Sequence, residues 1–164
     1  MIELVLSMML WIHNVTGYTI PEPPDISLVS KEMMLSYAYG CDLDPIPEEN
    51  IELCDTRKDW NLSEEGPLGM YDHVKRAIIM PDDFDINSIH DKSILLHEVV
   101  HHIQYANDVH NNVECKAKLE KEAYELQDEW LREKHNTDIY EAVGINKVFF
   151  SVSYTHLRAH ETRI

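Results

Sequence analysis

Apolar residues recur along the chain at spacings that predict a mixture of helices and short strands. In the first part of the chain we expect a helix over residues 1–12, a strand over residues 26–29 and a helix over residues 31–38. Gly17 marks the turn after the first helix, and Ser30 is a suitable N-cap for the second. Residues 41–68 are rich in Pro, Asp, Glu and Asn, and this composition predicts a long loop with little regular structure.

The pattern is sharper in the second half of the chain. Residues 69–72 and 76–80 predict two strands joined by a tight turn, with Pro81 closing this hairpin. Two long helices should follow. Asn87 or Ser88 opens the first, which runs to about residue 107, and the second covers about residues 113–135 with Asn136 as its exit. The order helix, strand, helix, hairpin, helix, helix predicts an α+β fold, in which a small sheet with an edge hairpin packs on the first of these two long helices.

That helix carries the sequence HEVVH, which runs from His97 to His101. Positions i and i+4 lie on one face of a helix, so the two imidazoles can bind one metal ion. Glu98 lies about 100° round the helix, from where its carboxylate can reach a water molecule bound to that ion. Apolar residues surround the motif and predict burial, which is costly for these polar groups unless a metal ion compensates them. Zinc suits such ligands because it accepts imidazole nitrogen and tolerates an open fourth position.

Catalytic zinc usually has three protein ligands, and the following helix supplies acidic candidates. Its predicted apolar stripe consists of Cys115, Leu119, Ala123, Leu126 and Trp130. Glu122 lies about 60° from the centre of this stripe, Glu129 about 80° and Glu120 about 100°. We therefore predict Glu122 as the third ligand, with Glu129 as the runner-up. The alternative is that Glu122 is one more solvated acid on a helix dense with them.

Other polar residues near the motif allow two interpretations each. Gln104 lies on the ligand side and either orients a ligand or is a surface residue. His102 points 100° away from His101, which favours a packing or supporting role over ligation. Tyr105 and Tyr124 either supply a hydrogen bond to an oxyanion or fill the core.

Composition limits the classes of function. The chain has 164 residues, which is about one domain, and its formal net charge of −16 argues against nucleic acid and membrane partners. Its first apolar segment is too short to span a membrane and lacks a cleavage site, so we expect a cytoplasmic protein. Cys41, Cys54 and Cys115 allow one disulfide, but an odd number fits a reducing compartment at least as well. Because Cys115 falls on the apolar stripe, we expect it to be buried.

The end of the chain differs from the rest. Residues 152–164, VSYTHLRAHETRI, resemble the in-frame translation of a transposon adapter from a sequencing library. We therefore treat residues 1–151 as a single domain and residues 152–164 as an artefactual tail. His156 and His160 are excluded from the candidate ligands for the same reason.

Two segments carry a resemblance to known metallopeptidases. LLHEVVHHIQ and ECKAKLEKEAYELQDEW are similar to sequences of zincins whose third ligand is a glutamate on the following helix. The pattern resembles the minimal gluzincins, the metallopeptidase domain of the ImmA/IrrE group and an uncharacterised bacterial and phage family. It covers about residues 69–131, with a weaker likeness near residues 19–29. The resemblance implies that His97, His101 and Glu122 bind zinc and that Glu98 is the general base.

The predicted function is therefore hydrolysis of peptide bonds by a zinc-activated water, with a peptide or protein as substrate. The hairpin strand over residues 76–80 is expected to be an edge to which an extended substrate adds as a further strand. Two alternatives remain open at this point. One is a non-catalytic, zinc-stabilised binding or regulatory module, and the other is an acidic interaction protein in which the motif is accidental.

Overall fold

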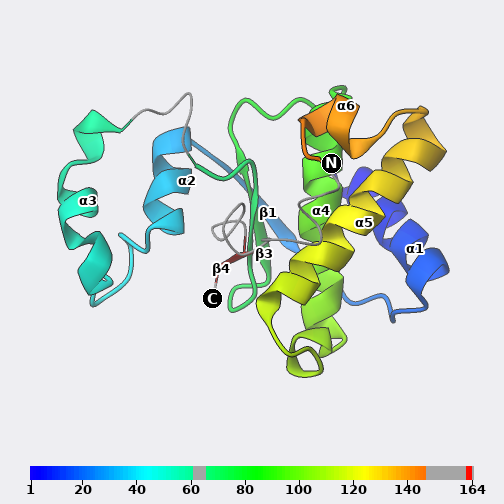
Figure 1. The fold of residues 1–164 in the computed structure, drawn as a ribbon, viewed down its shortest axis with the longest axis horizontal. Coiled ribbons are helices and arrows are strands. Elements are labelled where there is room, and N and C mark those ends of the chain that lie inside the picture. The colour runs from blue at the N-terminus through cyan, green and yellow to red at the C-terminus, as the bar shows by residue number, and fades with distance from the viewer. Residues whose placement is uncertain (61–65, 147–161, 164) are drawn as a thin grey trace.

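A computed structural model describes residues 1–60, 66–146 and 162–163 of the chain, and it has the predicted α+β fold (Figure 1). Its helices and strands are α1 (Ile2–Thr16), β1 (Asp25–Val29), α2 (Lys31–Ala38), α3 (Ile51–Asp55), β2 (Met70–Asp72), β3 (Ala77–Pro81), α4 (Ile89–Ala106), α5 (Lys116–His135), α6 (Ile139–Val143) and β4 (Thr162–Arg163). Three single turns of 3₁₀ helix accompany them: η1 (Glu48–Asn50), η2 (Arg57–Asp59) and η3 (Val109–Asn111). No helix in the described ranges is both long and apolar enough to cross a membrane.

Local capping signals set the ends of the helices as predicted. The hydroxyl groups of Ser30 and Ser88 accept hydrogen bonds from backbone N–H groups in the first turns of α2 and α4. Gly17 and Asn136 adopt the left-handed conformation that ends α1 and α5. These boundaries follow from short-range chemistry, which explains why the sequence located them.

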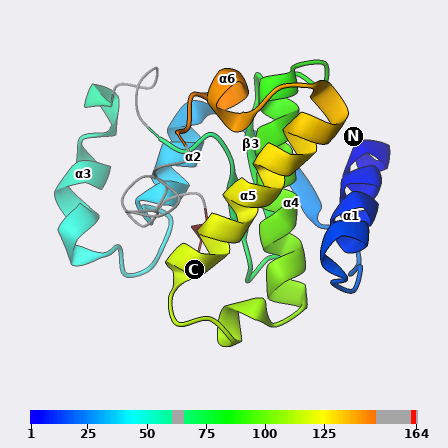
Figure 2. The ribbon, with the colours of Figure 1, turned by 45° about the vertical axis from the view of Figure 1, so that its right-hand side comes forward.

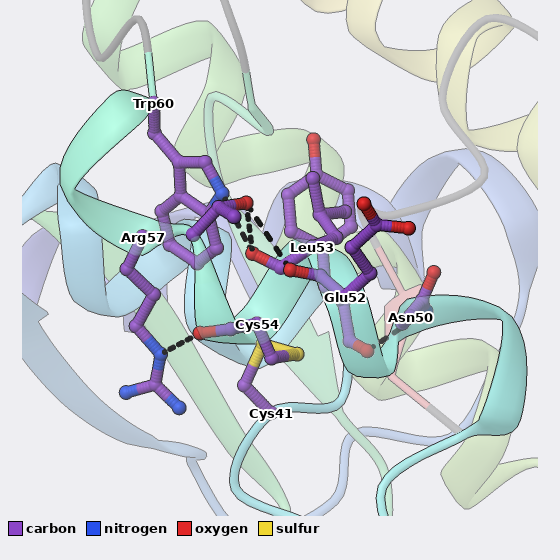
Figure 3. Close-up of a disulfide and its surroundings, with 9 residues drawn as sticks. Cys41, Asn50, Glu52, Leu53, Cys54, Arg57 and Trp60 are labelled. Atoms are coloured by element: carbon purple, nitrogen blue, oxygen red, sulfur yellow. Dashed lines mark hydrogen bonds between the residues drawn. A yellow bond between two sulfur atoms is a disulfide. The ribbon is translucent and has the colours of Figure 1, made fainter.

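The predicted loop over residues 41–68 has more structure than expected. It contains α3, flanked by η1 and η2, and a disulfide joins Cys41 to Cys54 across it (Figure 3). The Trp60 indole N–H donates to the Leu53 carbonyl at 3.2 Å and links the residue after η2 to α3. A disulfide and a side-chain hydrogen bond thus hold this segment together. Its sequence has no hydrophobic periodicity, so the pattern did not predict this structure.

The start of the last long helix also differs from the prediction. Residues 109–111 form η3, so α5 begins at Lys116 rather than near residue 113. Cys115 is the N-cap of α5, and its thiol is free and exposed rather than buried. The prediction that Cys115 belongs to the buried stripe is therefore wrong.

The strand order in the sheet is β1-β3-β2-β4. β1 runs parallel to β3, from Asp25 opposite Ala77 to Val29 opposite Pro81, while β2 pairs with β3 in the antiparallel sense. The hairpin forms as predicted, but its second strand is interior, and the expectation of a free edge along it is wrong. Strand β1, which lies far from the hairpin in the sequence, pairs with β3 on the side away from β2. The sequence of the hairpin alone does not predict this pairing.

Alternation along the strands divides the core between two faces of the sheet. Ile78 and Met80 belong to the main apolar cluster, which includes residues of α1, α4 and α5. Ile79 and Met70 point to the opposite face and pack with Met34 of α2. The sheet thus separates α4 from the segment that contains α2 and α3, as Figures 1 and 2 show.

The helix α4 lies at the centre of the helical layer. It contacts the sheet on one side, and α1 and α5 pack along it (Figure 2). Every residue from Ser93 to Gln104 is buried, which confirms the burial predicted from the apolar surroundings of the motif. Polar residues in this stretch must therefore find their partners inside the protein.

Most of the proposed tail lies outside the described residues. Thr162 and Arg163, which are described, form β4 and pair in parallel with Tyr71 and Asp72 of β2. The assignment of residues 152–164 to an artefactual tail stays a prediction.

Candidate metal centre

Two histidines of α4 and one glutamate of α5 form a buried group that could hold a metal ion. His97, His101 and Glu120 each offer one ligand atom, and these atoms all lie within 4.8 Å of one another. His101 Nε2 lies 2.9 Å from Glu120 Oε1, and His97 Nε2 lies 3.2 Å from Glu120 Oε2. The two Nε2 atoms are 3.1 Å apart. Three donor atoms thus converge on one point between the two helices.

Two glutamines determine how the histidine rings face this point. Gln104 Oε1 lies 2.9 Å from His101 Nδ1, and Gln127 Oε1 lies 3.0 Å from His97 Nδ1. The amide nitrogens have acceptors of their own, since Gln104 donates to the Leu119 carbonyl at 3.0 Å and Gln127 to the Ser93 hydroxyl at 3.1 Å. The amide oxygens therefore face the imidazoles, and each Nδ1 must be the protonated, donating nitrogen.

This arrangement leaves an excess of electron pairs at the centre. When Nδ1 carries the proton of a neutral imidazole, Nε2 is an acceptor. Two such nitrogens and a carboxylate then face one another at about 3 Å with no hydrogen atom between them. A metal cation removes this repulsion, whereas protonating both rings instead would place two imidazolium ions in contact. The donor set therefore fits a bound metal ion.

The charge state of Glu120 fits either positive partner. Burial opposes its ionisation, but the attraction and hydrogen bonds of His101 and His97, when their Nε2 atoms carry protons, outweigh burial and hold the pKa of Glu120 well below its ordinary value. A cation between the three groups would favour the same ionised carboxylate, which a metal ligand must be.

The structure groups Glu120, and not the predicted ligand Glu122, with the two histidines. Its carboxylate accepts hydrogen bonds from the Tyr18 hydroxyl at 2.9 and 3.0 Å and from Gln104 Nε2 at 3.2 Å. Burial together with Glu122 raises the pKa of Tyr18 to about 12. Glu122 thus contacts the cluster indirectly, through Gln104, which in turn contacts His101. Glu129, the runner-up, is exposed on α5.

The sequence pattern assigned the wrong buried face to α5, and this explains why it selected Glu122 instead of Glu120. The buried residues of this helix are Leu119, Glu120, Ala123, Tyr124, Leu126, Gln127, Asp128, Trp130 and Leu131. Their centre lies about 70° round the helix from that of the predicted stripe, so Glu120 faces inward and Glu122 faces away. Gln127 was missed altogether. The spacing of seven residues between Glu120 and Gln127, two helical turns, is the signal that could have placed both on one face.

Glu98 lies on a different side of α4 from the two ligands. It is fully buried, and its Cγ lies 3.1 Å from the point where a Cβ on Gly69 would be. Gly69 immediately precedes β2, so the glutamate side chain runs between α4 and the start of that strand. The role of Glu98 as general base stays a prediction.

The remaining candidates contact other buried groups of the protein. His102 bonds through Nδ1 to the Tyr71 hydroxyl at 2.9 Å and through Nε2 to the Glu22 carbonyl at 2.7 Å, which confirms that it is not part of the cluster. Gln104 is fully buried and contacts His101, so the surface alternative is wrong. The ring of Tyr124 packs 4.5 Å from that of His97.

Fold and site together define an α+β protein with a buried histidine–glutamate group suited to a metal ion. The chain belongs to the family described as a domain of unknown function, DUF6647, which matches residues 46–148. No curated protein and no solved structure matches the chain.

Proposed function

We propose that the protein is a zinc-dependent metallopeptidase, in which His97, His101 and Glu120 bind the metal and Glu98 is the general base. The observation that carries the proposal is the convergence of two amide-oriented Nε2 atoms on one buried carboxylate. Zinc bonds of 2.0–2.1 Å at tetrahedral angles separate neighbouring donors by roughly 3.3 Å. The two nitrogens are 3.1 Å apart, and each lies 2.9 or 3.2 Å from a different oxygen of Glu120, which is close to this value.

The residues of the chain have separate tasks in this proposal. His97, His101 and Glu120 would hold a zinc ion, which would supply a Lewis acid and lower the pKa of a water molecule toward about 7. Glu98 takes a proton from the attacking water and passes it to the leaving amine nitrogen. Gln104 and Gln127 keep both imidazoles in the ligating tautomer, as hydrogen-bond partners of metal-bound histidines do.

Two measurements test the proposal. Mass spectrometry of the purified protein should find one zinc per chain, and His101→Ala should lose most of it. Glu98→Gln should keep the zinc yet cleave nothing in a peptide library that the unmodified protein cleaves. Glu129→Gln is the matched control, because it makes the same chemical change at an exposed position of α5. An active Glu98→Gln protein would remove the general-base role.

Burial of the centre favours a second candidate, a zinc-stabilised module without catalysis. The exposed fractions are 1% for His97, 0% for His101 and 7% for Glu120, whereas a catalytic zinc keeps one position open to water and substrate. Cobalt substitution distinguishes the two candidates. With an open position, adding acetohydroxamate should change the visible spectrum of the cobalt protein. With a closed one, the spectrum should stay the same.

A further inference from the structure

A cavity lies where the turn between β2 and β3 approaches the end of α4. Its volume is about 350 Å³, and it is lined by Tyr71, His73, Arg76, Tyr105, Ala106 and His110. A volume of this size is typical of small-molecule sites. The lining residues carry no carboxylate, although the chain as a whole has a net charge of −16. The cavity is thus an exception to the acidic character of the protein.

Aromatic rings form most of its wall. The ring of Tyr105 stacks with that of His73 at 4.6 Å and with that of His110 at 4.3 Å, at interplanar angles of 16° and 27°. Tyr71 adds a third contact to Tyr105, with ring centroids 5.8 Å apart. Planar walls of this kind favour a ligand with a flat body.

One polar atom of the wall lacks a partner. His110 Nδ1 is buried and makes no hydrogen bond to any residue that the structure describes. A buried polar atom without a partner is unfavourable, so a bound molecule that bonds to this nitrogen would stabilise the site.

Arg76 supplies a permanent positive charge. It occupies the hairpin turn with φ of 53°, and its carbonyl accepts a hydrogen bond from the Asp25 N–H at 3.2 Å, which anchors the backbone. Burial raises the pKa of Tyr71 to about 12, and the positive charge of Arg76 opposes this rise, so its field reaches the wall of the cavity. A guanidinium group matches the geometry of carboxylate and phosphate groups.

We propose that this cavity binds a small organic anion, with a flat body against the tyrosine and histidine rings and a carboxylate or phosphate near Arg76 and His110. The proposal does not depend on the reaction at the metal centre. The competing explanation is that Arg76 only balances the negative end of the α4 dipole.

Fluorine NMR with three probes tests the proposal on the purified full-length protein. The probes are 4-fluorobenzoate, 4-fluorophenyl phosphate and the neutral 4-fluorobenzamide. We expect the two anions to bind and the amide to bind at least about fivefold more weakly, given an exposed charged partner. Tighter binding of the phosphate or of the carboxylate identifies the source of the anionic group.

Arg76→Gln should weaken anion binding by about fivefold to tenfold. Lys75→Gln, the same change of charge at the neighbouring residue outside the cavity wall, should leave it unchanged. His110→Phe keeps a stacking ring but removes Nδ1, and it should also weaken binding. Equal binding of benzoate and benzamide, or equal effects of Arg76→Gln and Lys75→Gln, would overturn the proposal. The second outcome would mean that the anions respond to the overall charge of the hairpin turn and not to Arg76 in the cavity wall.

Discussion

The choice between two glutamates two residues apart on α5 offers the sharpest test of the metal centre. Glu120→Gln replaces a carboxylate whose two oxygens lie 2.9 and 3.2 Å from the imidazole nitrogens of the cluster. Glu122→Gln makes the identical chemical change in a residue that contacts the cluster only through Gln104. The two variants therefore have the same charge and the same composition, and they differ only in position.

The structure gives the expected size of each effect. Changes to residues that orient metal ligands typically reduce metal affinity by about 10–100-fold, so loss of a direct ligand should exceed about 100-fold, or about 2.7 kcal/mol. For Glu122→Gln we expect less than about tenfold, because Gln104 retains its bond to the Leu119 carbonyl at 3.0 Å. The amide oxygen of the new side chain can still accept from the Tyr18 hydroxyl.

Competition with a chromophoric zinc chelator measures both affinities. Circular dichroism and thermal unfolding of the metal-free proteins serve as controls that both variants are folded. If Glu122→Gln weakened zinc binding as much as Glu120→Gln or more, the ligand assignment would fail, and with it the geometric argument from the glutamines.

Three further predictions concern stability. Gly69→Ala should lower the free energy of unfolding by about 1–3 kcal/mol in urea denaturation, because its Cβ would lie 2.9, 3.0 and 3.1 Å from side-chain atoms of β3 and α4; an unchanged midpoint would contradict this packing. Reducing the Cys41–Cys54 disulfide, which closes a separation of 13 residues, should cost up to about 3 kcal/mol while zinc content stays the same; loss of zinc would contradict the independence of the two regions. The bond from Tyr18 to Glu122 should stabilise the fold fully below pH 10 and be lost as the pH rises toward about 12, because the folded pKa of Tyr18 is raised. Melting temperatures of the unmodified protein and of Tyr18→Phe should therefore converge at high pH, and a constant difference would refute this.

The elements that the sequence predicted well are those fixed by neighbouring residues. Ser30 and Ser88 cap the helices that follow them, and Gly17 and Asn136 end the helices that precede them. The histidine pair belongs to the same class, since the spacing i to i+4 within one helix determines that the two rings meet. Each of these features depends on contacts within a few residues.

The glutamate of the cluster could not be found in this way, because its position depends on how α5 is rotated against α4. The exposed residue Cys115 was counted in the apolar stripe, and the buried residues Tyr124, Gln127 and Leu131 were left out. Together these errors turned the inferred face away from Glu120. Buried polar residues that serve a metal site look like surface residues in a hydrophobicity pattern, so such a pattern assigns the wrong phase where the site lies.

Two features next to the candidate metal centre lie in a part of the chain that precedes the family match. The matched residues 46–148 include all three ligand residues of the cluster and both glutamines that orient them. Residue Tyr18, which bonds to Glu122, and strand β1, which pairs along β3, both lie before this segment. Because β1 occupies the edge of β3 that the hairpin alone would leave free, a peptide cannot add there. A substrate of the proposed peptidase must therefore bind in a way other than strand addition at this edge of β3.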